Sequence, residues 1–393
     1  MLSPPQPAKG PGLLERLNRA AHRAGGFWDR VSDGLEIQAL WSQFFSEARA
    51  SYRLYTREID WEALNKEKGV RRFFRVAKLL FWAMLMKLSP ARRVFLLLAL
   101  LFVLLAITKS RAGISAGHVE VSVPNNLLEV LLAVGALVFL LALELADRVT
   151  MKRDLEIAHE IQHWLVPQAP PRVPGVDIAF SSRPANTVGG DYYDAFLLDG
   201  AAERLLLVVA DVAGKSVPAA LLMATFQASL RTVASSATPL ADIVARMNDY
   251  ACAHSLGGRR FTTAFFADFN PATRALTYIR AGHNVPILRR AAGELERLEE
   301  GDLPLGINPG TSFPSGSTTL VPGDLLVIFT DGVIEAVNEH DQEFGEARLL
   351  DLLRATPPES AAATLARFTS AVEAFAGTAR QHDDITWLIF RME

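Results

Sequence analysis

The chain has 393 residues, of which 50% are hydrophobic and 21% are charged, and its formal net charge is −3. This length predicts two to three domains, and the charge excludes the strongly basic surface typical of nucleic-acid-binding proteins, so we expect no nucleic-acid partner. A single cysteine, Cys252, excludes an internal disulfide framework and a cysteine-rich zinc site. We interpret Cys252 as an ordinary buried thiol.

The amino-terminal part of the chain shows two kinds of composition. Residues 1–33 begin with the proline-rich stretch "MLSPPQPAKG", which predicts a disordered or poorly structured terminus. Residues 34–90 place aromatic and aliphatic side chains at helical spacing between charged ones, which predicts amphipathic helices. Basic residues collect toward the end of this region, so we interpret it as juxtamembrane.

Two almost entirely aliphatic runs follow, "VFLLLALLFVLLAIT" at 94–108 and "LLEVLLAVGALVFLLALELA" at 127–146. Both are slightly short against the roughly 20 residues that cross a bilayer, so buried core helices are an alternative. Because a short polar loop separates them, we expect a transmembrane helical hairpin over residues 91–147. Lysine and arginine flank the hairpin on both sides, which predicts that both ends face the cytoplasm.

Residues 148–170 continue with apolar side chains at steps of three and four, namely Leu155, Ala158, Ile161 and Leu165. No helix breaker occurs before Pro167. The pattern predicts a helical, coiled-coil-like linker, through which the protein would form a homodimer.

The remainder, residues 171–393, alternates short β-rich runs with helical stretches. The β-rich runs include "RLLLVVADV", "TTAFFADF", "ALTYIRAG" and "DLLVIFTDG". Helical stretches are expected at 217–234, 239–256, 346–355 and 359–376. Many strands with a few inserted helices predict an α+β layered domain.

Aspartates lie at the edges of the apolar strands in this domain. They are Asp191 and Asp194 in "GGDYYD", Asp211 in "VVADVAGKS", Asp331 in "VIFTDG", and Asp383 with Asp384 in "QHDDIT". Each alone fits a turn or a helix cap. Together they gather carboxylates with few cationic partners in the same motifs, which favours magnesium or manganese over zinc. Glycines beside them let the backbone approach a metal or phosphate closely.

An ordered set of motifs resembles the SpoIIE/RsbU-type branch of the PPM metal-dependent serine/threonine phosphatases. The motifs are "VGGDYYDAF", "ADVAGKSVPAALLMA", "TTAFFADF", "AGHNVP", "LPLGI", "GDLLVIFTDGVIEAVN", "FGEARL" and "HDDIT", and the resemblance covers about 157–392. It implies a β-sandwich of two antiparallel sheets flanked by helices, with two Mn²⁺ or Mg²⁺ ions at one end.

The resemblance also implies residue roles. Asp211 would bridge both ions, the main-chain carbonyl of Val212 would lie next to it, and Asp331 and Asp383 would complete the shell of one metal. The catalytic set would therefore be Asp211, Asp331 and Asp383. The nucleophile would be metal-activated water rather than a side chain.

The resemblance implies other roles for three further aspartates. Asp194 would bind through water or serve an additional metal, whereas Asp191 would bind metal or stabilise the hairpin, and the sequence does not separate the two. Asp384 would order its neighbour through hydrogen bonds.

In "DVAGKS" the sequence departs from the motif that is usual in this branch, because Ser216 occupies a position usually held by glycine. The branch lacks the phosphate-gripping arginine of the wider PPM family, and Arg183 is a candidate replacement by proximity alone. For His283 in "AGHN" we favour a structural role over that of a general acid.

The resemblance implies a membrane-anchored phosphoserine/phosphothreonine protein phosphatase of the bacterial inner membrane, with a cytoplasmic catalytic domain. Its substrate would be a phosphorylated protein, typically a STAS-type anti-sigma-factor antagonist in partner-switching signalling. The linker would bias the helix that follows Asp211. The alternative is a catalytically inactive relay that keeps the phosphatase fold and binds a partner protein.

Overall fold

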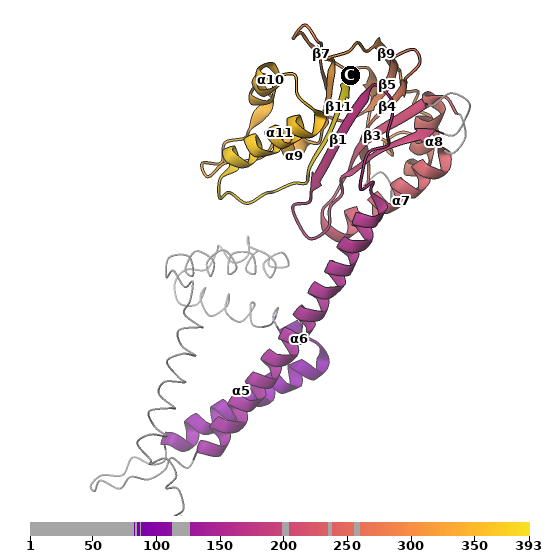
Figure 1. Ribbon diagram of the computed structural model, residues 1–393. Coiled ribbons are helices and arrows are strands. Elements are labelled where there is room, and N and C mark those ends of the chain that lie inside the picture. Colours follow the sequence, from indigo (N-terminus) through magenta and orange to yellow (C-terminus); the bar gives the residue numbers. More distant parts are fainter. Residues whose placement is uncertain are drawn as a thin grey trace, which may run out of the picture. The chain divides into compact units, whose positions relative to one another are not determined.

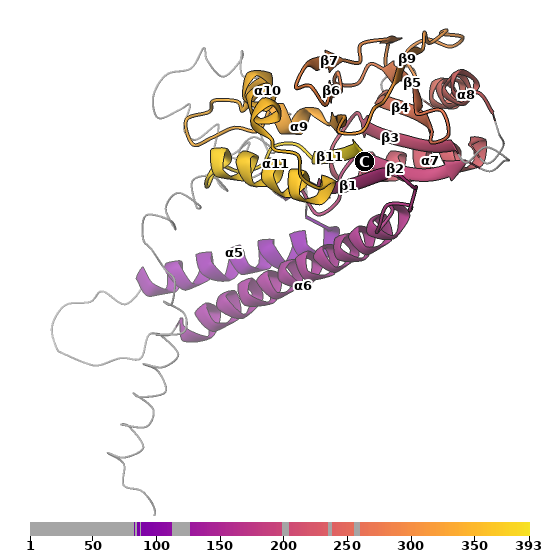
Figure 2. The same ribbon diagram turned by 45° about the horizontal axis from the view of Figure 1, so that its top comes forward.

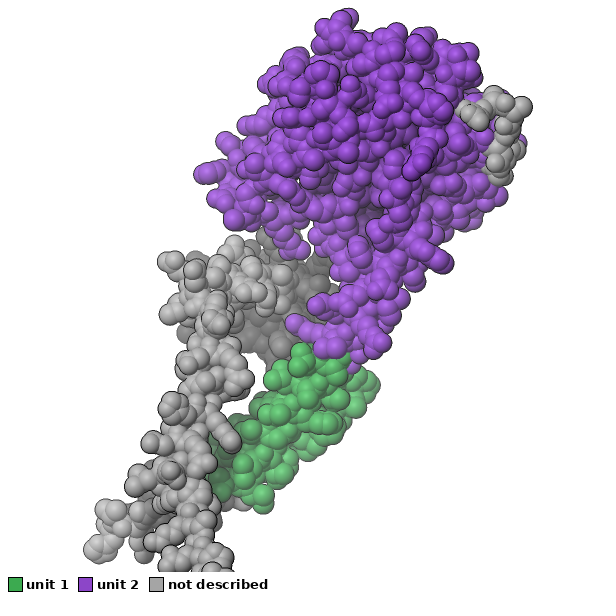
Figure 3. All heavy atoms as spheres, viewed as in Figure 1, with its two compact units in different colours: residues 1–146 green, residues 147–393 purple. Residues whose placement is uncertain are grey.

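The computed structural model describes residues 82, 85, 86, 88–111, 126–198, 204–234, 238–254 and 260–393. The expectations for residues 1–33, and for all but a few positions of 34–90, lie outside this part of the chain. The chain divides into two compact units between Ala146 and Asp147 (Figure 3), and each unit is described by itself.

The described part of the first unit is a pair of antiparallel helices, α5 (Pro90–Arg111) and the first part of α6 (Leu127–Leu165) (Figure 1). Asn126 donates to the carbonyl of Ala106 at 2.9 Å, and at the other end of the pair Arg92 lies 3.1 Å from Glu144. Small side chains line the contact between the helices, because Ala99, Ala106 and Ala133 are buried.

Large aliphatic side chains cover the outside of this helix pair. Val94, Leu97, Leu104, Leu131, Val138 and Leu141 are among those exposed. The apolar windows of the two helices have mean hydropathies of 2.3 and 2.4, so both are long and apolar enough to cross a membrane. The expected helical hairpin is therefore present as a structure.

Helix α6 does not end with the apolar run but continues to Leu165, so the second run and residues 148–165 of the expected linker form one helix. Leu155, Ala158 and Leu165, three residues of the predicted coiled-coil seam, are half-buried. The fourth, Ile161, is exposed, and it lies in one row with the exposed Ile157 and Trp164.

The second unit contains two sheets packed face to face (Figure 2). The first sheet has the order β1 (Val176–Arg183), β11 (Ile385–Met392), β10 (Leu325–Phe329), β6 (Ile287–Arg289) and β7 (Leu295–Arg297). The second has the order β2 (Tyr192–Leu198), β3 (Arg204–Val212), β4 (Thr262–Asn270), β5 (Ala275–Ala281) and β8 (Gly301–Asp302), with β9 (Gly316–Thr319) also paired to β5. All pairs are antiparallel except the short β5–β8 pair.

Strand periodicity decides which side chains fill the space between the sheets. In β3, Leu205, Leu207 and Val209 point into the core between the sheets. The intervening Leu206, Val208 and Ala210 face the opposite side, where helices cover them. Successive strand residues point to opposite faces of the sheet. The continuous apolar run of β3 therefore packs both against the other sheet and against the helices.

Helices cover both outer faces and complete a four-layer arrangement. α7 (Ser216–Val233) and α8 (Leu240–Ala253) pack on the sheet that contains β3, and α9 (Asp331–Ile334), α10 (Gly345–Ala355) and α11 (Ala361–Ala376) pack on the other. The four expected helical stretches correspond to α7, α8, α10 and α11, and the predicted α+β sandwich is confirmed.

Two residues of the helices α7 and α8 have an unexpected backbone conformation or burial. Ser216, at the start of α7, has a φ of 60°, which is the left-handed region that favours glycine. A glycine in its place would adopt this backbone without the steric cost. Cys252 on α8 is half-buried rather than fully buried.

Candidate active site

Sheet topology brings the ends of four strands to one end of the sandwich. Tyr192 pairs with Ala210, so Asp191, just before β2, lies beside Asp211 near the end of β3. In the other sheet Phe329 pairs with Trp387, so the end of β10 and the start of β11 also lie together. Strands β2 and β11 are in contact across the two sheets.

The carboxylates at these strand ends raise the pKa values of one another. Burial, and then the negative charges of Asp331, Asp383 and Asp384, raise the pKa of Asp211 to about 7. Burial and the charge of Asp383 also raise the pKa of Asp331. The site therefore gathers more negative charge than the side chains around it neutralise.

Asp191 belongs to this group. Its side chain is buried, and its Oδ2 accepts a hydrogen bond of 2.8 Å from the hydroxyl of Thr330. Burial and the charges of Asp211 and Asp384 raise its pKa well above the ordinary value.

Asp384 organises the loop that carries Asp191. Its carboxylate accepts hydrogen bonds from the backbone N–H of Ala185 at 2.7 Å and of Gly190 at 2.6 Å. A Cβ at Gly189 would collide with the same carboxylate, and a Cβ at Gly332 would collide with the Asp384 main chain. These two glycines therefore permit close packing around Asp384, and the loop that Asp384 holds is the one before β2, a role that the sequence did not predict.

Gly190 permits a second close approach. A Cβ at this position would lie 2.8 Å from the carbonyl oxygen of Val212. The Val212 carbonyl is thus held next to Asp211 and against the loop before β2.

The structure does not bring Asp194 into this group. Its side chain is fully buried on the opposite face of β2 and accepts two hydrogen bonds, of 2.8 and 2.7 Å, from the guanidinium of Arg231 on α7. The Tyr192 hydroxyl also donates to it. Burial raises the pKa of Asp194, while Tyr192 and Arg231 oppose that shift.

His283 is buried and lies 3.1 Å from the Thr263 hydroxyl through its Nδ1. Burial lowers the pKa of His283 to about 3, so the ring is neutral at physiological pH. This environment agrees with the structural role favoured from the sequence.

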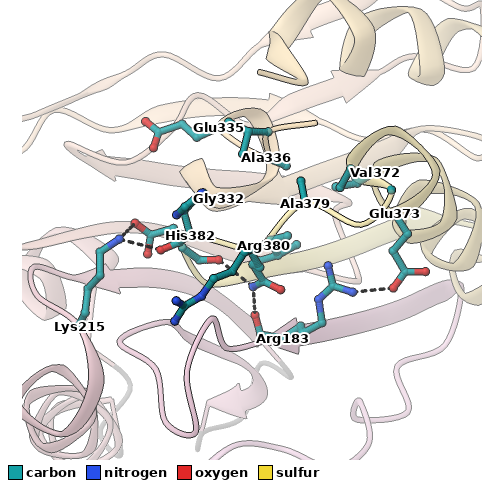
Figure 4. A pocket seen from close by; sticks show the side chains of 16 residues that line it. Arg183, Lys215, Gly332, Glu335, Ala336, Val372, Glu373, Ala379, Arg380 and His382 are labelled. Carbon is teal, nitrogen blue, oxygen red and sulfur yellow. Dashed lines mark hydrogen bonds and ion pairs between the residues drawn. The ribbon is translucent and has the colours of Figure 1, made fainter. Parts of the chain in front are cut away.

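A pocket of about 510 Å³ opens beside the acidic group and includes Asp383 and Gly332 in its wall (Figure 4). The Lys215 ammonium reaches into it and lies 2.8 Å both from Asp383 Oδ2 and from the carbonyl oxygen of His382. Arg183 lines the same pocket and forms a 2.7 Å ion pair with Glu373. The lysine thus supplies part of the positive charge that the carboxylates need.

Helix α6 contacts the site through a residue that sequence reasoning missed. The Gln162 side chain donates to the carbonyl of Gly189 at 2.7 Å and accepts from its N–H at 3.1 Å. The linker helix is therefore bonded directly to the glycine pair that precedes Asp191.

Across the described residues, no three histidine, cysteine or acidic side chains are close enough to form a ready-made cage for a metal ion. The donors nevertheless fit a hard divalent cation in their chemistry, since they are carboxylates and one carbonyl. The raised pKa of Asp211 has neighbouring negative charge among its causes, and a bound cation would neutralise that charge.

Comparisons with known proteins agree with this geometry. Residues 201–393 match the family model described as "Stage II sporulation protein E (SpoIIE)". The chain is 30% identical over 243 residues to Protein IcfG of Synechocystis sp., covering 55% of this chain and 38% of that protein. It is 29% identical over 191 residues to "Phosphoserine phosphatase RsbU" of Bacillus subtilis, covering 48% of this chain and 56% of that protein.

The chain thus spans less than two thirds of the length of these curated relatives. Among solved structures, the SiaA-PP2C domain of Pseudomonas aeruginosa superposes with a TM-score of 0.56 at 23% identity, over 63% of this chain and 99% of that domain. This likeness shows the fold. The family match over residues 201–393 agrees with the resemblance described above for the carboxyl-terminal domain.

Proposed function

We propose that the protein is a metal-dependent phosphoserine/phosphothreonine protein phosphatase, because residues 201–393 match the SpoIIE family model. The observation that carries this proposal is the convergence of carboxylates from four strand ends, with the pKa of Asp211 raised to about 7. Such an excess of buried negative charge is typical of a cation-binding catalytic centre.

The proposed ligands for two Mn²⁺ or Mg²⁺ ions are Asp211, the Val212 carbonyl, Asp331, Asp383 and Asp191. Asp194 is not in this set, because Arg231 and Tyr192 already engage its oxygens on the other face of β2. When bound, the ions would supply positive charge and lower the pKa of the water that attacks phosphorus.

The chain's own residues would hold these groups in place. Asp384 and the glycines fix the loop before β2, and Thr330 fixes the Asp191 carboxylate. Lys215 adds a positive charge at the edge of the pocket. The pocket beside these groups would admit a phosphorylated side chain presented on a protein surface.

We propose that the substrate is a phosphorylated STAS-type anti-sigma-factor antagonist in bacterial partner-switching signalling. The likeness to RsbU supports the class of substrate. The two apolar helices support anchoring in the inner membrane with the catalytic domain in the cytoplasm. The exposed apolar side chains of α6 support a homodimer through this helix.

The test is phosphate release by the full chain in detergent, from para-nitrophenyl phosphate and from a phosphoserine-bearing STAS protein. We expect release with Mn²⁺ or Mg²⁺, none with chelator, and none from Asp211→Asn. Asp351→Asn, a change at an exposed carboxylate on α10, is the matched control and should keep full activity. A folded native chain that binds the STAS protein and never releases phosphate with any divalent metal would favour the inactive relay instead.

A further inference from the structure

The pocket beside the carboxylates carries three long basic side chains, Arg183, Lys215 and Arg380, on its walls (Figure 4). A phosphorylated substrate brings about two negative charges into this space. The proposed metal ions would offset part of the repulsion from the carboxylates, and a cation of the chain could add a directional contact to the phosphoryl group.

Two of the three cations already have partners. Arg183 is paired with Glu373 at 2.7 Å. Lys215 is bonded to Asp383 and to the His382 carbonyl. Arg380, by contrast, is exposed and has no hydrogen bond or ion pair with any residue that the structure describes.

The backbone that carries Arg380 is nevertheless fixed on both sides. Gln381 donates to the carbonyl of Arg183 at 2.8 Å and to that of Asp383 at 2.7 Å. On the other side, the Thr378 hydroxyl donates to Glu339 at 2.7 Å. The guanidinium thus extends from an anchored segment, and in Figure 4 it points toward the side of the pocket where Lys215 lies.

We propose that Arg380 binds the phosphoryl group of the substrate and takes the part for which the sequence suggested Arg183. This inference rests on the proposed function. A guanidinium can donate two parallel hydrogen bonds to a phosphate, and its charge offsets that of the carboxylates nearby. Arg183 is less suited because binding phosphate would require breaking its pair with Glu373.

The experiment compares the native full chain in detergent with Arg380→Ala, Arg380→Lys and the control Arg354→Ala, an exposed arginine on α10. Each is assayed for kcat/KM on a phosphoserine protein and for inhibition by inorganic phosphate. Phosphate binding is also measured by calorimetry in the presence of Mg²⁺. Mn²⁺ binding is followed by electron paramagnetic resonance, which reports on the metal site independently of turnover.

For Arg380→Ala we expect kcat/KM to fall and phosphate binding to weaken, each by roughly 10- to 100-fold, the size of a lost charge-assisted hydrogen bond. Arg380→Lys should recover part of both losses, while Arg354→Ala should match the native chain. Mn²⁺ binding should be unchanged in all variants, which also shows that they are folded.

Equal kcat/KM and equal phosphate binding in native chain and Arg380→Ala would overturn the inference and leave the proposed function standing. If the native chain shows no turnover, the proposed function fails separately, and calorimetry still decides on Arg380. Weaker phosphate binding in Arg380→Ala then supports the site, and equal binding overturns it.

Discussion

The two aspartates of "GGDYYD" lie three positions apart at the start of one strand, and an odd spacing places side chains on opposite faces. Asp191 shares its face with Tyr193 and Ala195, which point into the core between the sheets. Asp194 shares its face with Tyr192 and Phe196, which pack toward α7. One carboxylate therefore joins the acidic group, while the other is buried and forms an ion pair with the partly exposed Arg231.

Exchanging each aspartate should separate these two roles. We expect Asp194→Asn to destabilise the fold by about 1 to 3 kcal/mol, because the buried side chain loses its charge-assisted hydrogen bonds with Arg231, and to leave Mn²⁺ affinity unchanged. Asp191→Asn should weaken Mn²⁺ binding. Denaturant unfolding and Mn²⁺ titration measure the two effects. Loss of Mn²⁺ affinity in Asp194→Asn at full stability would return this residue to the metal set.

The pH dependence of stability follows from Asp211. Its pKa is about 7 in the folded chain and about 3.9 when unfolded. Between these values the folded state binds more protons, so the free energy of unfolding should fall as pH rises from 4 to 7. One pKa unit corresponds to about 1.4 kcal/mol, so the total fall should be on the order of a few kcal/mol.

The measurement is thermal unfolding in chelator at pH 5 and pH 8, with and without Mg²⁺. The native chain should be less stable at pH 8, and Mg²⁺ should restore much of the loss by binding the ionised carboxylates. Asp211→Asn should show a smaller fall, although Asp191 and Asp331 retain a shift of the same sign. An identical fall in the variant would show that Asp211 does not carry it.

At the level of elements, α6 and the loop before β2 are joined by the paired hydrogen bonds of Gln162 with Gly189. The next residue, Gly190, donates to Asp384. A chain of contacts therefore runs from the linker helix to the acidic group, and a displacement of α6 would reach the site through it.

Gln162→Ala should loosen this loop. We expect faster amide hydrogen exchange in residues 185–191 and weaker Mn²⁺ binding, because the loop that holds Asp191 loses two hydrogen bonds worth about 1 kcal/mol each. Glu160→Ala, an exposed position on the same helix, is the control and should exchange as the native chain does. Unaltered exchange in Gln162→Ala would show that the loop is held by Asp384 alone.

The local sequence pattern could predict the strands and helices, but not the hydrogen bonds that Asp194 and Asp384 form. The run at 204–212 coincides with β3, because apolar strand residues and their boundaries are encoded within a few positions. The convergence of the aspartates could be expected because strand ends meet at the edges of sheets. The partners that decide individual roles lie far away: Arg231 is 37 residues from Asp194, and Asp384 is 194 residues from Gly190. The alternation of side chains along a strand could, however, have predicted that Asp191 and Asp194 lie on opposite faces of β2.

At the scale of the whole molecule, the helix pair α5–α6 should anchor the protein in a membrane. Its outer surface is made of large aliphatic side chains, whose exposure to water would cost about 25 cal/mol per Å². We expect the full chain to sediment with membranes and to resist extraction at high pH. A chain lacking residues 90–146 should be released into the soluble fraction. Recovery of the full chain in the soluble fraction would contradict the anchor.

The association of two chains is the last property that the exposed surface predicts. Ile157, Ile161 and Trp164 follow one another at helical spacing on α6, and Trp164 is 87% exposed. A second copy of the helix would cover these side chains, since an apolar stripe of this spacing is what a two-helix contact buries. We expect the full chain in detergent to sediment as a dimer, and Ile157→Glu with Ile161→Glu to sediment as a monomer because two buried carboxylates would face each other. Glu156→Gln and Glu160→Gln, conservative changes at neighbouring exposed positions, should stay dimeric. A dimer that survives both glutamates would place the association elsewhere in the chain and would leave the row on α6 as a surface for another partner.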